Sequence, residues 1–352
     1  MNTHELLITT HALLSAHKGL LAMDESTSTC NARFAELGIA QTVEARRSYR
    51  ELLITTPRLH ECISGAILVD ETIRQSMPDG RSFVDVLTKA GILPGIKVDL
   101  GVKELAGFPG EKITEGLDGL RQRLTDYRQM GARFAKWRVV ISLSESGSKL
   151  LPTTACVEAN MHDLARFAAL CQEADLVPIV EPEVLMAGSH SIARCEEVTE
   201  RVLRTLFRHL NEQQVQLEGM ILKTGMVVAG YSCTDQATAD EVAAATLRCL
   251  KRTVPAAVPG VAFLSGGQTP DQASTNLNAM HVYTDKQVPW VLTFSFARAI
   301  QQPAMALWNG QSENVAVAQK SLLYRAGCNS AATMGKYRTA DHTVIPARAL
   351  QA

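Results

Sequence analysis

Short runs of apolar residues, most of them closed by a polar or charged residue, recur along the chain and predict buried β-strands. Most runs are rich in Val, Ile, Leu and Phe. They lack the polar alternation of a strand with one face in water, so both faces should be covered. Eight such runs occupy residues 19–24, 63–70, 93–99, 132–142, 176–183, 219–225, 260–266 and 288–296.

Segments of helical periodicity lie between the runs, at residues 114–131, 192–210 and 240–254. Thr114 and Thr269 are expected to cap helices, and Gly91 and Gly131 to end them. Strands that alternate with helices in this way predict a (β/α)8 TIM barrel. A doubly wound open sheet is the weaker alternative, because no Gly-x-Gly-x-x-Gly follows the first run.

We expect a single domain over residues 1–352, with an N-terminal arm at about 1–17 and a C-terminal tail at about 338–352. In a barrel of this kind, the active site lies at the carboxyl ends of the strands. Side chains two positions apart share one face of a strand, so ionisable pairs with this spacing should point together into the barrel mouth. The residues expected there are Asp24, Lys97, Asp99, Lys136, Arg138, Glu181, Glu183 and Lys223.

Lys223 is the candidate nucleophile. An ammonium group at the end of a buried strand loses hydration, which favours the neutral amine that forms Schiff bases with carbonyls. A lone lysine could extend into solvent instead, but the polar chemistry at the other strand ends favours a site. Lys136 would add a second positive charge nearby and favour the neutral amine further. Glu181 can shuttle protons while the carbinolamine loses water, and Asp24 can hydrogen-bond substrate hydroxyls.

Two groups of residues could bind phosphate. The Ser265-Gly266-Gly267 turn offers backbone N–H groups to an anion, and Arg298 can bind the same anion through two hydrogen bonds. Positive charge for a second phosphate comes from Arg33, Lys97 and Arg138. The pattern predicts a doubly phosphorylated sugar as substrate. No metal or other cofactor is expected, because the protonated imine accepts the electrons.

The composition argues against several kinds of partner and location. Lys and Arg total 35 and Asp and Glu total 36, so a net charge of −1 does not favour nucleic acid or an anionic membrane. No apolar run approaches the ~20 residues that span a bilayer. The N-terminus lacks a signal-peptide pattern, so we expect a cytoplasmic protein. The eight cysteines contain no Cys-x-x-Cys pair and should be reduced thiols.

Several motifs occur in one order between about residues 18 and 337. They are LLAMDEST (20–27), GIKVD (95–99), GLDGL (116–120), FAKWR (134–138), PIVEPE (178–183), LEG (217–219) leading to Lys223, FLSGGQ (263–268) and LTFS (292–295). Any one of them could arise by chance, but the whole ordered set is specific. On these motifs, the chain resembles the class I fructose-bisphosphate aldolases of the animal and plant type.

The resemblance implies the reversible cleavage of fructose 1,6-bisphosphate to dihydroxyacetone phosphate and glyceraldehyde 3-phosphate, in glycolysis and gluconeogenesis, by a homotetramer. It assigns Lys223 as the Schiff-base lysine and Glu181 as the general acid/base. The residues that it implies around the imine are Asp24, Lys136 and Glu183. The phosphate contacts that it implies are Ser265, Gly266 and Arg298 for the 1-phosphate, and Ser26, Arg33, Lys97 and Arg138 towards the 6-phosphate or the substrate hydroxyls.

The chain departs from the family pattern near these positions. Thr224-Gly225 stands where the family usually has Pro-Asn after the lysine, and Ala297 stands where it has Gly. Ala32 replaces a lysine beside the 6-phosphate arginine and so removes a positive charge. The animal enzymes end in a catalytic tyrosine. Here the last tyrosine is Tyr337, so proton transfer by the tail is expected to be missing or replaced.

Two other interpretations stay open. The loss of charge at Ala32 also suits a related Schiff-base aldolase that favours fructose 1-phosphate or sedoheptulose 1,7-bisphosphate. The interpretation from a different class is a non-catalytic scaffold that kept the fold for protein binding. A pure scaffold, however, has no physical need for buried charges such as Lys136 and Glu181.

Overall fold

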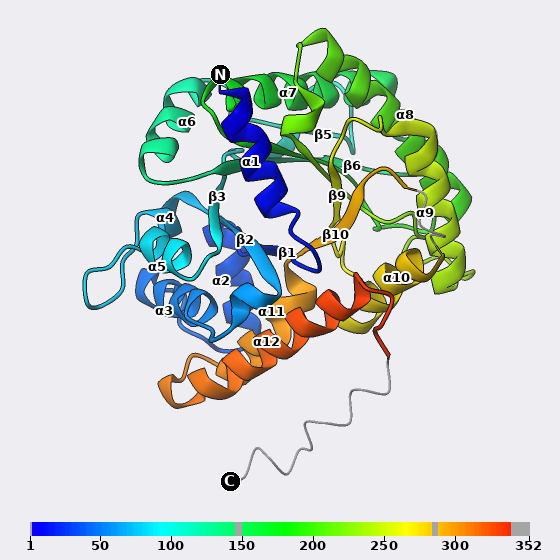
Figure 1. The fold of residues 1–352 in the computed structure, drawn as a ribbon. Helices are drawn as coiled ribbons and strands as arrows, with labels where there is room; N and C mark the ends of the chain where they lie inside the picture. Colours follow the sequence, from blue (N-terminus) through cyan, green and yellow to red (C-terminus); the bar gives the residue numbers. More distant parts are fainter. Residues whose placement is uncertain (1, 145–149, 284–287, 339–352) are drawn as a thin grey trace.

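The centre of the protein is a closed barrel of eight parallel strands, as the computed structural model shows (Figure 1). The structure describes residues 2–144, 150–283 and 288–338. The barrel strands are β1 (Gly19–Ala22), β2 (Ile63–Leu68), β3 (Leu93–Lys97), β6 (Phe134–Ile141), β7 (Val177–Val184), β8 (Ile221–Thr224), β9 (Gly260–Phe263) and β10 (Val291–Phe296). Because β10 pairs with β1, the ring is closed. The predicted TIM barrel and each of its predicted strands are confirmed.

Helices surround the barrel (Figure 1). They are α2 (Thr27–Glu36), α3 (Val43–Ile54), α4 (Asp70–Ile73), α5 (Phe83–Lys89), α6 (Leu120–Gln129), α7 (Thr154–Glu173), α8 (Ile192–Glu212), α9 (Ala239–Thr253), α10 (Pro270–Tyr283), α11 (Arg298–Trp308) and α12 (Val315–Ala332), with short 3-10 turns at Leu59–Glu61, Leu217–Gly219 and Ser312–Asn314. The hydroxyl of Thr269 accepts a hydrogen bond from the Gln272 N–H at 3.2 Å, so the predicted cap of α10 is confirmed. Gly91 and Gly131 follow α5 and α6 with φ of 77° and 103°, which L side chains rarely adopt.

The prediction of Thr114 as a helix cap is wrong. Helix α6 begins at Leu120, and Thr114 ends the short strand β5 (Lys112–Thr114). This strand pairs with β4 (Val102–Glu104) in an antiparallel two-stranded sheet. Each strand has only three residues and β4 is exposed, so the alternating pattern that signals a strand had no room to appear.

Inward-facing positions change from apolar to ionisable along the barrel axis. On β6, Phe134 precedes Lys136 by two residues, and on β8, Ile221 precedes Lys223. The apolar members form an inner core of Leu20, Ala22, Ile67, Phe134, Val177, Ile179, Ile221 and Ala262, with Leu6, Leu13 and Leu14. The alternate residues of the strands, such as Trp137 and Leu222, belong to a larger apolar cluster beneath the helices. The lower barrel is therefore filled with hydrocarbon, and the charges collect above it.

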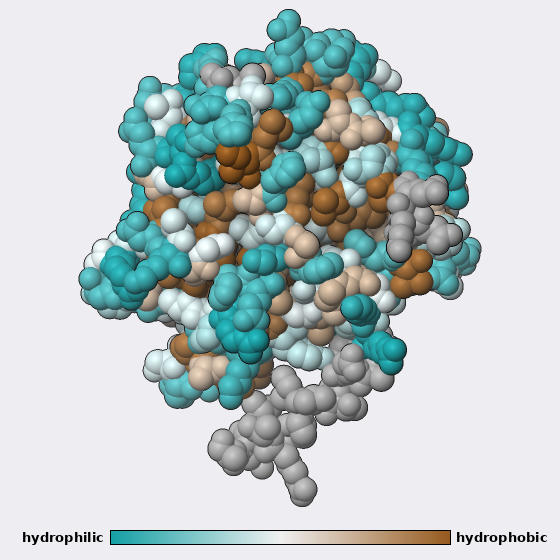
Figure 2. All heavy atoms as spheres, in the orientation of Figure 1, coloured by the Kyte–Doolittle hydropathy of each residue, from teal (hydrophilic) through white to brown (hydrophobic). Residues whose placement is uncertain are grey.

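Helix α1 (Thr3–Leu13) lies across the end of the barrel where the strands begin (Figure 1). Its Leu6 and Leu13 are fully buried in the inner core. Figure 2 shows apolar side chains in the middle of this face and polar side chains around its rim. The segment predicted as an N-terminal arm thus contains a packed helix. The predicted C-terminal tail lies, apart from residue 338, outside the described residues. Within the described part of the chain, no helix has both the length and the apolar character needed to cross a membrane.

Gly95→Ala should destabilise the protein, because the Phe134 ring fills the space beside Gly95 inside the barrel. A Cβ atom at position 95 would lie 2.2 Å from that ring. Overpacking of this kind costs about 1–3 kcal/mol. Gly327→Ala, on α12, is the control, because nothing lies within 4 Å of its Cβ position. Urea unfolding followed by circular dichroism measures both variants, and equal midpoints would contradict the packing described here.

Candidate active site

A cavity of about 830 Å³ opens at the carboxyl ends of the barrel strands. Thirteen residues predicted from the sequence line it together: Asp24, Ser26, Arg33, Lys97, Asp99, Lys136, Arg138, Glu181, Glu183, Lys223, Ser265, Gly266 and Arg298. The remaining predicted residue, Gly267, follows Gly266 in the same turn and lies against Tyr231 instead. Side chains from β3, β6, β7 and β8, from the segments that directly follow β1 and β9, and from helices α2 and α11 therefore meet in one place.

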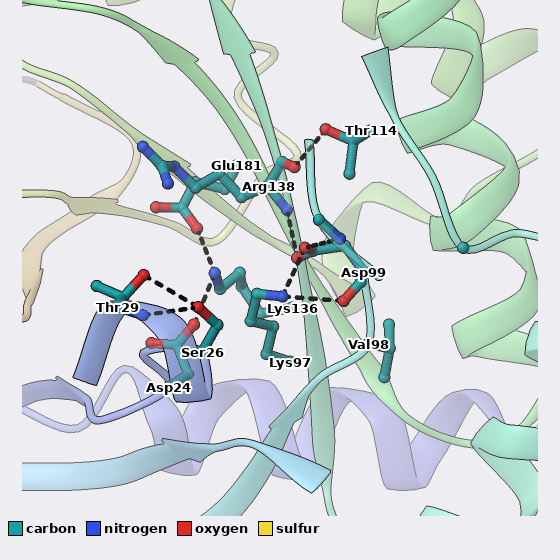
Figure 3. Close-up of polar contacts among 12 residues, drawn as sticks. Asp24, Ser26, Thr29, Lys97, Val98, Asp99, Thr114, Lys136, Arg138 and Glu181 are labelled. Atoms are coloured by element: carbon teal, nitrogen blue, oxygen red, sulfur yellow. Dashed lines mark hydrogen bonds and ion pairs between the residues drawn. The ribbon is translucent and has the colours of Figure 1, made fainter. Parts of the chain in front are cut away.

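A row of alternating charges crosses the floor of this cavity. The Lys136 Nζ atom lies 2.7 Å from Asp24 Oδ2 and 3.0 Å from Glu181 Oε2. The second oxygen of Glu181 lies 3.0 Å from Lys223 Nζ. All four side chains are buried, and Figure 3 shows the Lys136 amine between the carboxylates of Asp24 and Glu181. The row of two cations and two anions has no net charge when each group is ionised.

Burial and neighbouring charge oppose each other in this row. Burial disfavours the charged form of Asp24, but the ammonium groups of Lys136 and Lys223 outweigh it and hold the pKa of this carboxyl well below its usual range. The same competition lowers the pKa of Glu181. Burial also opposes the charge of Lys136, yet Asp24 and Glu181 raise the pKa of its amine far above the ordinary value. Lys136 is therefore a fixed cation between two fixed anions.

A second group of ion pairs lies in the same cavity. Lys97 Nζ lies 2.6 Å from Asp99 Oδ1, and Arg138 pairs with Glu183. The other Asp99 oxygen accepts a hydrogen bond from the Arg138 backbone N–H at 3.3 Å. Thr114 donates to the Arg138 carbonyl at 2.9 Å, so the β4–β5 sheet is fastened to the site (Figure 3). Both members of each predicted pair, 97 with 99, 136 with 138 and 181 with 183, line the cavity, so residues two apart point together into the barrel mouth.

The start of helix α2 forms one wall of the cavity. Ser26 caps the helix by accepting from the Thr29 N–H at 3.2 Å. Both residues line the cavity together with Ser28, so hydroxyl groups gather at a helix N-terminus, where the helix dipole favours an anion. The sequence could have indicated all three residues, because a strand end here leads directly into a capped helix. Only Ser26 was predicted as a substrate contact.

Arg33 lies on the same helix and already has a partner. Its Nη1 atom lies 2.6 Å from Glu25 Oε1, and the buried Arg50 holds the other oxygen of Glu25 at 2.7 Å. Neither Glu25 nor Arg50 was expected in this role. Ala32 also lines the cavity. Its methyl group leaves room where a longer side chain would reach inwards.

The turn after β9 forms the opposite wall. Gly266 and Gly267 have φ of 54° and 90°, two successive left-handed residues that turn the backbone sharply. Arg298 begins helix α11 beside the turn and lines the cavity. Tyr231, which the sequence did not indicate, donates its hydroxyl hydrogen to the Gly266 carbonyl at 2.7 Å.

The positions that depart from the family pattern lie in or near the cavity, except for one. Thr224 is buried at the end of β8, and Ala297 lines the cavity. Tyr337 is buried elsewhere, with its backbone N–H donating to Asn278 at 2.8 Å on α10. In the described residues, no three His, Cys, Asp or Glu side chains gather as they would around a metal ion. All eight cysteines are free thiols.

The closed barrel, with buried lysines and carboxylates at its carboxyl end, defines a TIM-barrel enzyme. The family model described as fructose-bisphosphate aldolase class-I matches residues 5–350. This chain belongs to the class I fructose-bisphosphate aldolase family, and the predicted family and class of enzyme are confirmed.

Individual relatives agree over nearly the whole chain. The probable fructose-bisphosphate aldolase class 1 of Xanthomonas axonopodis pv. citri (strain 306) is 54% identical over 339 residues, which are 96% of this chain and 100% of the relative. Fructose-bisphosphate aldolase 4, cytosolic, of Arabidopsis thaliana is 47% identical over 96% of this chain and 85% of its own. A fructose-bisphosphate aldolase from Plasmodium falciparum, crystallised with TRAP and a small-molecule inhibitor, has a TM-score of 0.92 at 47% identity over 95% of each chain.

Lys136→Met should destabilise the protein most at neutral pH. Asp24 and Glu181 would lose the cation that lowers their pKa values most, so burial should raise the pKa of at least one of the two carboxyls above its unfolded value. The loss should be about 3–5 kcal/mol near pH 7. It should shrink as the pH falls through the raised pKa values, because the folded variant then binds more protons than the unfolded chain.

The wild type should behave in the opposite way. Its depressed carboxyl pKa values mean that this contribution is complete above the ordinary carboxyl range and is lost only below it. Urea unfolding of both proteins at a series of pH values between about 5 and 8 tests this. Lys251→Met, an exposed change on α9, is the control. A stability difference independent of pH would contradict the pairing.

Proposed function

We propose that the protein reversibly cleaves fructose 1,6-bisphosphate to dihydroxyacetone phosphate and glyceraldehyde 3-phosphate through a Schiff base on Lys223, without a metal ion. The observation that carries this proposal is the 3.0 Å contact between Lys223 Nζ and Glu181 Oε1 inside the buried charge row. A lysine amine within proton-transfer distance of a buried carboxylate can lose and regain protons without help from bulk water.

Imine formation uses these two residues. Lys223 passes a proton to Glu181, and the neutral amine attacks the C2 carbonyl carbon of the open-chain sugar. The amine gives up a second proton as the carbonyl oxygen becomes a hydroxyl. Glu181 then protonates this hydroxyl, which leaves as water. Two protons of the ammonium group thus depart in the water molecule, and the third stays on the imine nitrogen.

Carbon–carbon cleavage uses the positive charge of the imine. Asp24 accepts the proton of the C4 hydroxyl, C4 becomes an aldehyde carbon, and the electrons of the C3–C4 bond move into the imine to give an enamine. Glyceraldehyde 3-phosphate leaves. The proton that Asp24 accepted is returned to C3 of the enamine, and water then hydrolyses the protonated imine, which releases dihydroxyacetone phosphate and restores the Lys223 ammonium and the Asp24 carboxylate. Lys136 keeps Asp24 ionised, because its fixed ammonium lies 2.7 Å from the carboxylate.

The two walls of the cavity suit the two phosphates. The turn at Ser265 and Gly266, with Arg298, would bind the 1-phosphate. The start of α2, with Ser26, and the side chains of Arg33, Lys97 and Arg138 would bind the 6-phosphate. Each of these three cations already pairs with a carboxylate of the protein. The 6-phosphate would therefore meet less free positive charge than the sequence suggested.

The pairing of these cations with carboxylates of the protein also favours the second candidate function, a Schiff-base aldolase with a broader choice of substrate. With Ala32 in the wall, fructose 1-phosphate and sedoheptulose 1,7-bisphosphate are expected as further substrates of the same imine chemistry. A non-catalytic scaffold is not supported, because the buried row would cost stability without serving a purpose.

The assembly, location and pathway are also proposals. We infer a homotetramer in the cytoplasm that works in glycolysis and gluconeogenesis, with the whole chain as one catalytic domain. The word cytosolic in the name of the Arabidopsis relative supports the location. Family membership supports the pathway.

Lys223→Met should abolish labelling when dihydroxyacetone phosphate and borohydride are added, because the reduced imine forms only on this lysine. Circular dichroism should show that the variant keeps its fold. Lys320→Met, exposed on α12, is the control and should label normally. Peptide mass mapping locates the label, and a label on Lys136 or Lys97 in the wild type would overturn the assignment.

Ala32→Lys should widen the preference for fructose 1,6-bisphosphate over fructose 1-phosphate, because it adds a positive charge to the wall of the cavity where the 6-phosphate is proposed to bind. A charge-assisted contact should raise the ratio of the two kcat/KM values by roughly one to two decades. The matched control is Ala35→Lys, which adds the same charge on α2 at an exposed position outside the cavity lining. An unchanged ratio in Ala32→Lys would show that position 32 does not act on the 6-phosphate.

A further inference from the structure

Tyr231 lies on the loop between β8 and α9 and reaches across to the turn after β9. Three backbone hydrogen bonds of 2.9 Å fasten this loop to the one after β7, from Gly230, Tyr231 and Ser232 to the carbonyls of His190, Met186 and Gly188. The side chain is therefore presented from a fixed backbone. Its hydroxyl donates to the Gly266 carbonyl at 2.7 Å, which joins two loops that are 35 residues apart in the chain.

Gly267 leaves the space that the phenol occupies. A Cβ atom on Gly267 would lie 1.5 Å from the Tyr231 hydroxyl oxygen and 3.1 Å from Arg298 Nη2. The phenol and the guanidinium therefore meet over this glycine. Burial raises the pKa of Tyr231, although the Arg298 guanidinium beside it acts in the other direction. The hydroxyl thus keeps its hydrogen and remains a donor at neutral pH.

The Gly266 carbonyl controls the direction of a backbone donor. In a planar trans peptide, the C=O of one residue and the N–H of the next point in opposite directions. When Tyr231 holds the Gly266 carbonyl, it also fixes the Gly267 N–H on the side away from the phenol. Tyr231 is 53% exposed, so water could satisfy its hydroxyl, and the side chain does not need a carbonyl partner for its own stability.

We propose that Tyr231 is a positioning and specificity residue for the phosphate bound at the turn of Ser265, Gly266 and Gly267. Its hydroxyl sets the direction of the backbone donors and holds Arg298 beside them. The proposal rests on the proposed function. Preorganised donors bind an anion without first losing their own freedom, so the hydroxyl strengthens binding of every ligand that carries the 1-phosphate. Among the described residues, no hydrogen bond joins Tyr231 to Lys223, so the hydroxyl should not change the chemical step.

Tyr231→Phe tests the hydroxyl alone. The KM for fructose 1,6-bisphosphate and the dissociation constant of dihydroxyacetone phosphate should both rise roughly 3- to 10-fold, as expected for one lost hydrogen bond. The inhibition constant of glyceraldehyde 3-phosphate, which carries the other phosphate, should stay the same, and kcat should change by less than about twofold. Tyr283→Phe, at a tyrosine 57% exposed on α10, is the matched control and should alter none of these constants.

The outcomes separate this proposal from the proposed function. Calorimetric titration with dihydroxyacetone phosphate needs no turnover, so it measures the role of Tyr231 even if cleavage fails. Equal affinities of wild type and Tyr231→Phe would overturn the positioning role, and so would equal weakening towards both triose phosphates. A wild type that binds dihydroxyacetone phosphate without cleaving the bisphosphate would overturn the proposed function alone. A wild type that does neither would overturn both.

Discussion

The pairing of Lys136 with Asp24 and Glu181 is the interaction on which the rest of the site depends. Removing charges from water costs several kcal/mol per ion, and this cost is offset only where opposite charges are close and well oriented. Here the distances are 2.7 and 3.0 Å, and Glu181 reaches on to Lys223 with its second oxygen. The cost of burying each charge in the row is offset by the opposite charges beside it. The site therefore assembles as a unit rather than residue by residue.

Strand register connects this row to the fold. Lys136 of β6 is aligned with Lys97 of β3 and with Ile179 of β7, two residues before Glu181. A slip of one residue would turn the ionisable side chains into the apolar layer beneath the helices. Phe134 and the inner core below resist such a slip, because they would have to move outwards at the same time. The apolar half of each strand thus holds the charged half in position.

The sequence was sufficient to predict site residues that follow a local spacing rule. It was insufficient for residues whose role depends on partners distant in the chain. The spacing of two that joins Lys97 to Asp99 is visible in the chain, as is the lysine at the end of β8. Glu25 bound between Arg33 and Arg50 is different, because its partners lie 8 and 25 residues away and nothing local marks them. Tyr231 was missed for the same reason. The β4–β5 sheet was too short for its alternation to be seen.

The way that helix α1 closes the barrel has a consequence for synthesis on the ribosome. This helix is synthesised first, yet Leu14, which follows it, packs beside Gly260. One edge of β1 stays unpaired until β10 has been synthesised. Contacts of such long sequence separation slow folding. Until about residue 296 has emerged, the nascent chain has an unpaired strand edge and an incompletely filled apolar interior. The ionisable side chains of several strands are not yet paired with one another. Interrupted translation would therefore leave a fragment that is prone to aggregate, rather than a smaller working enzyme.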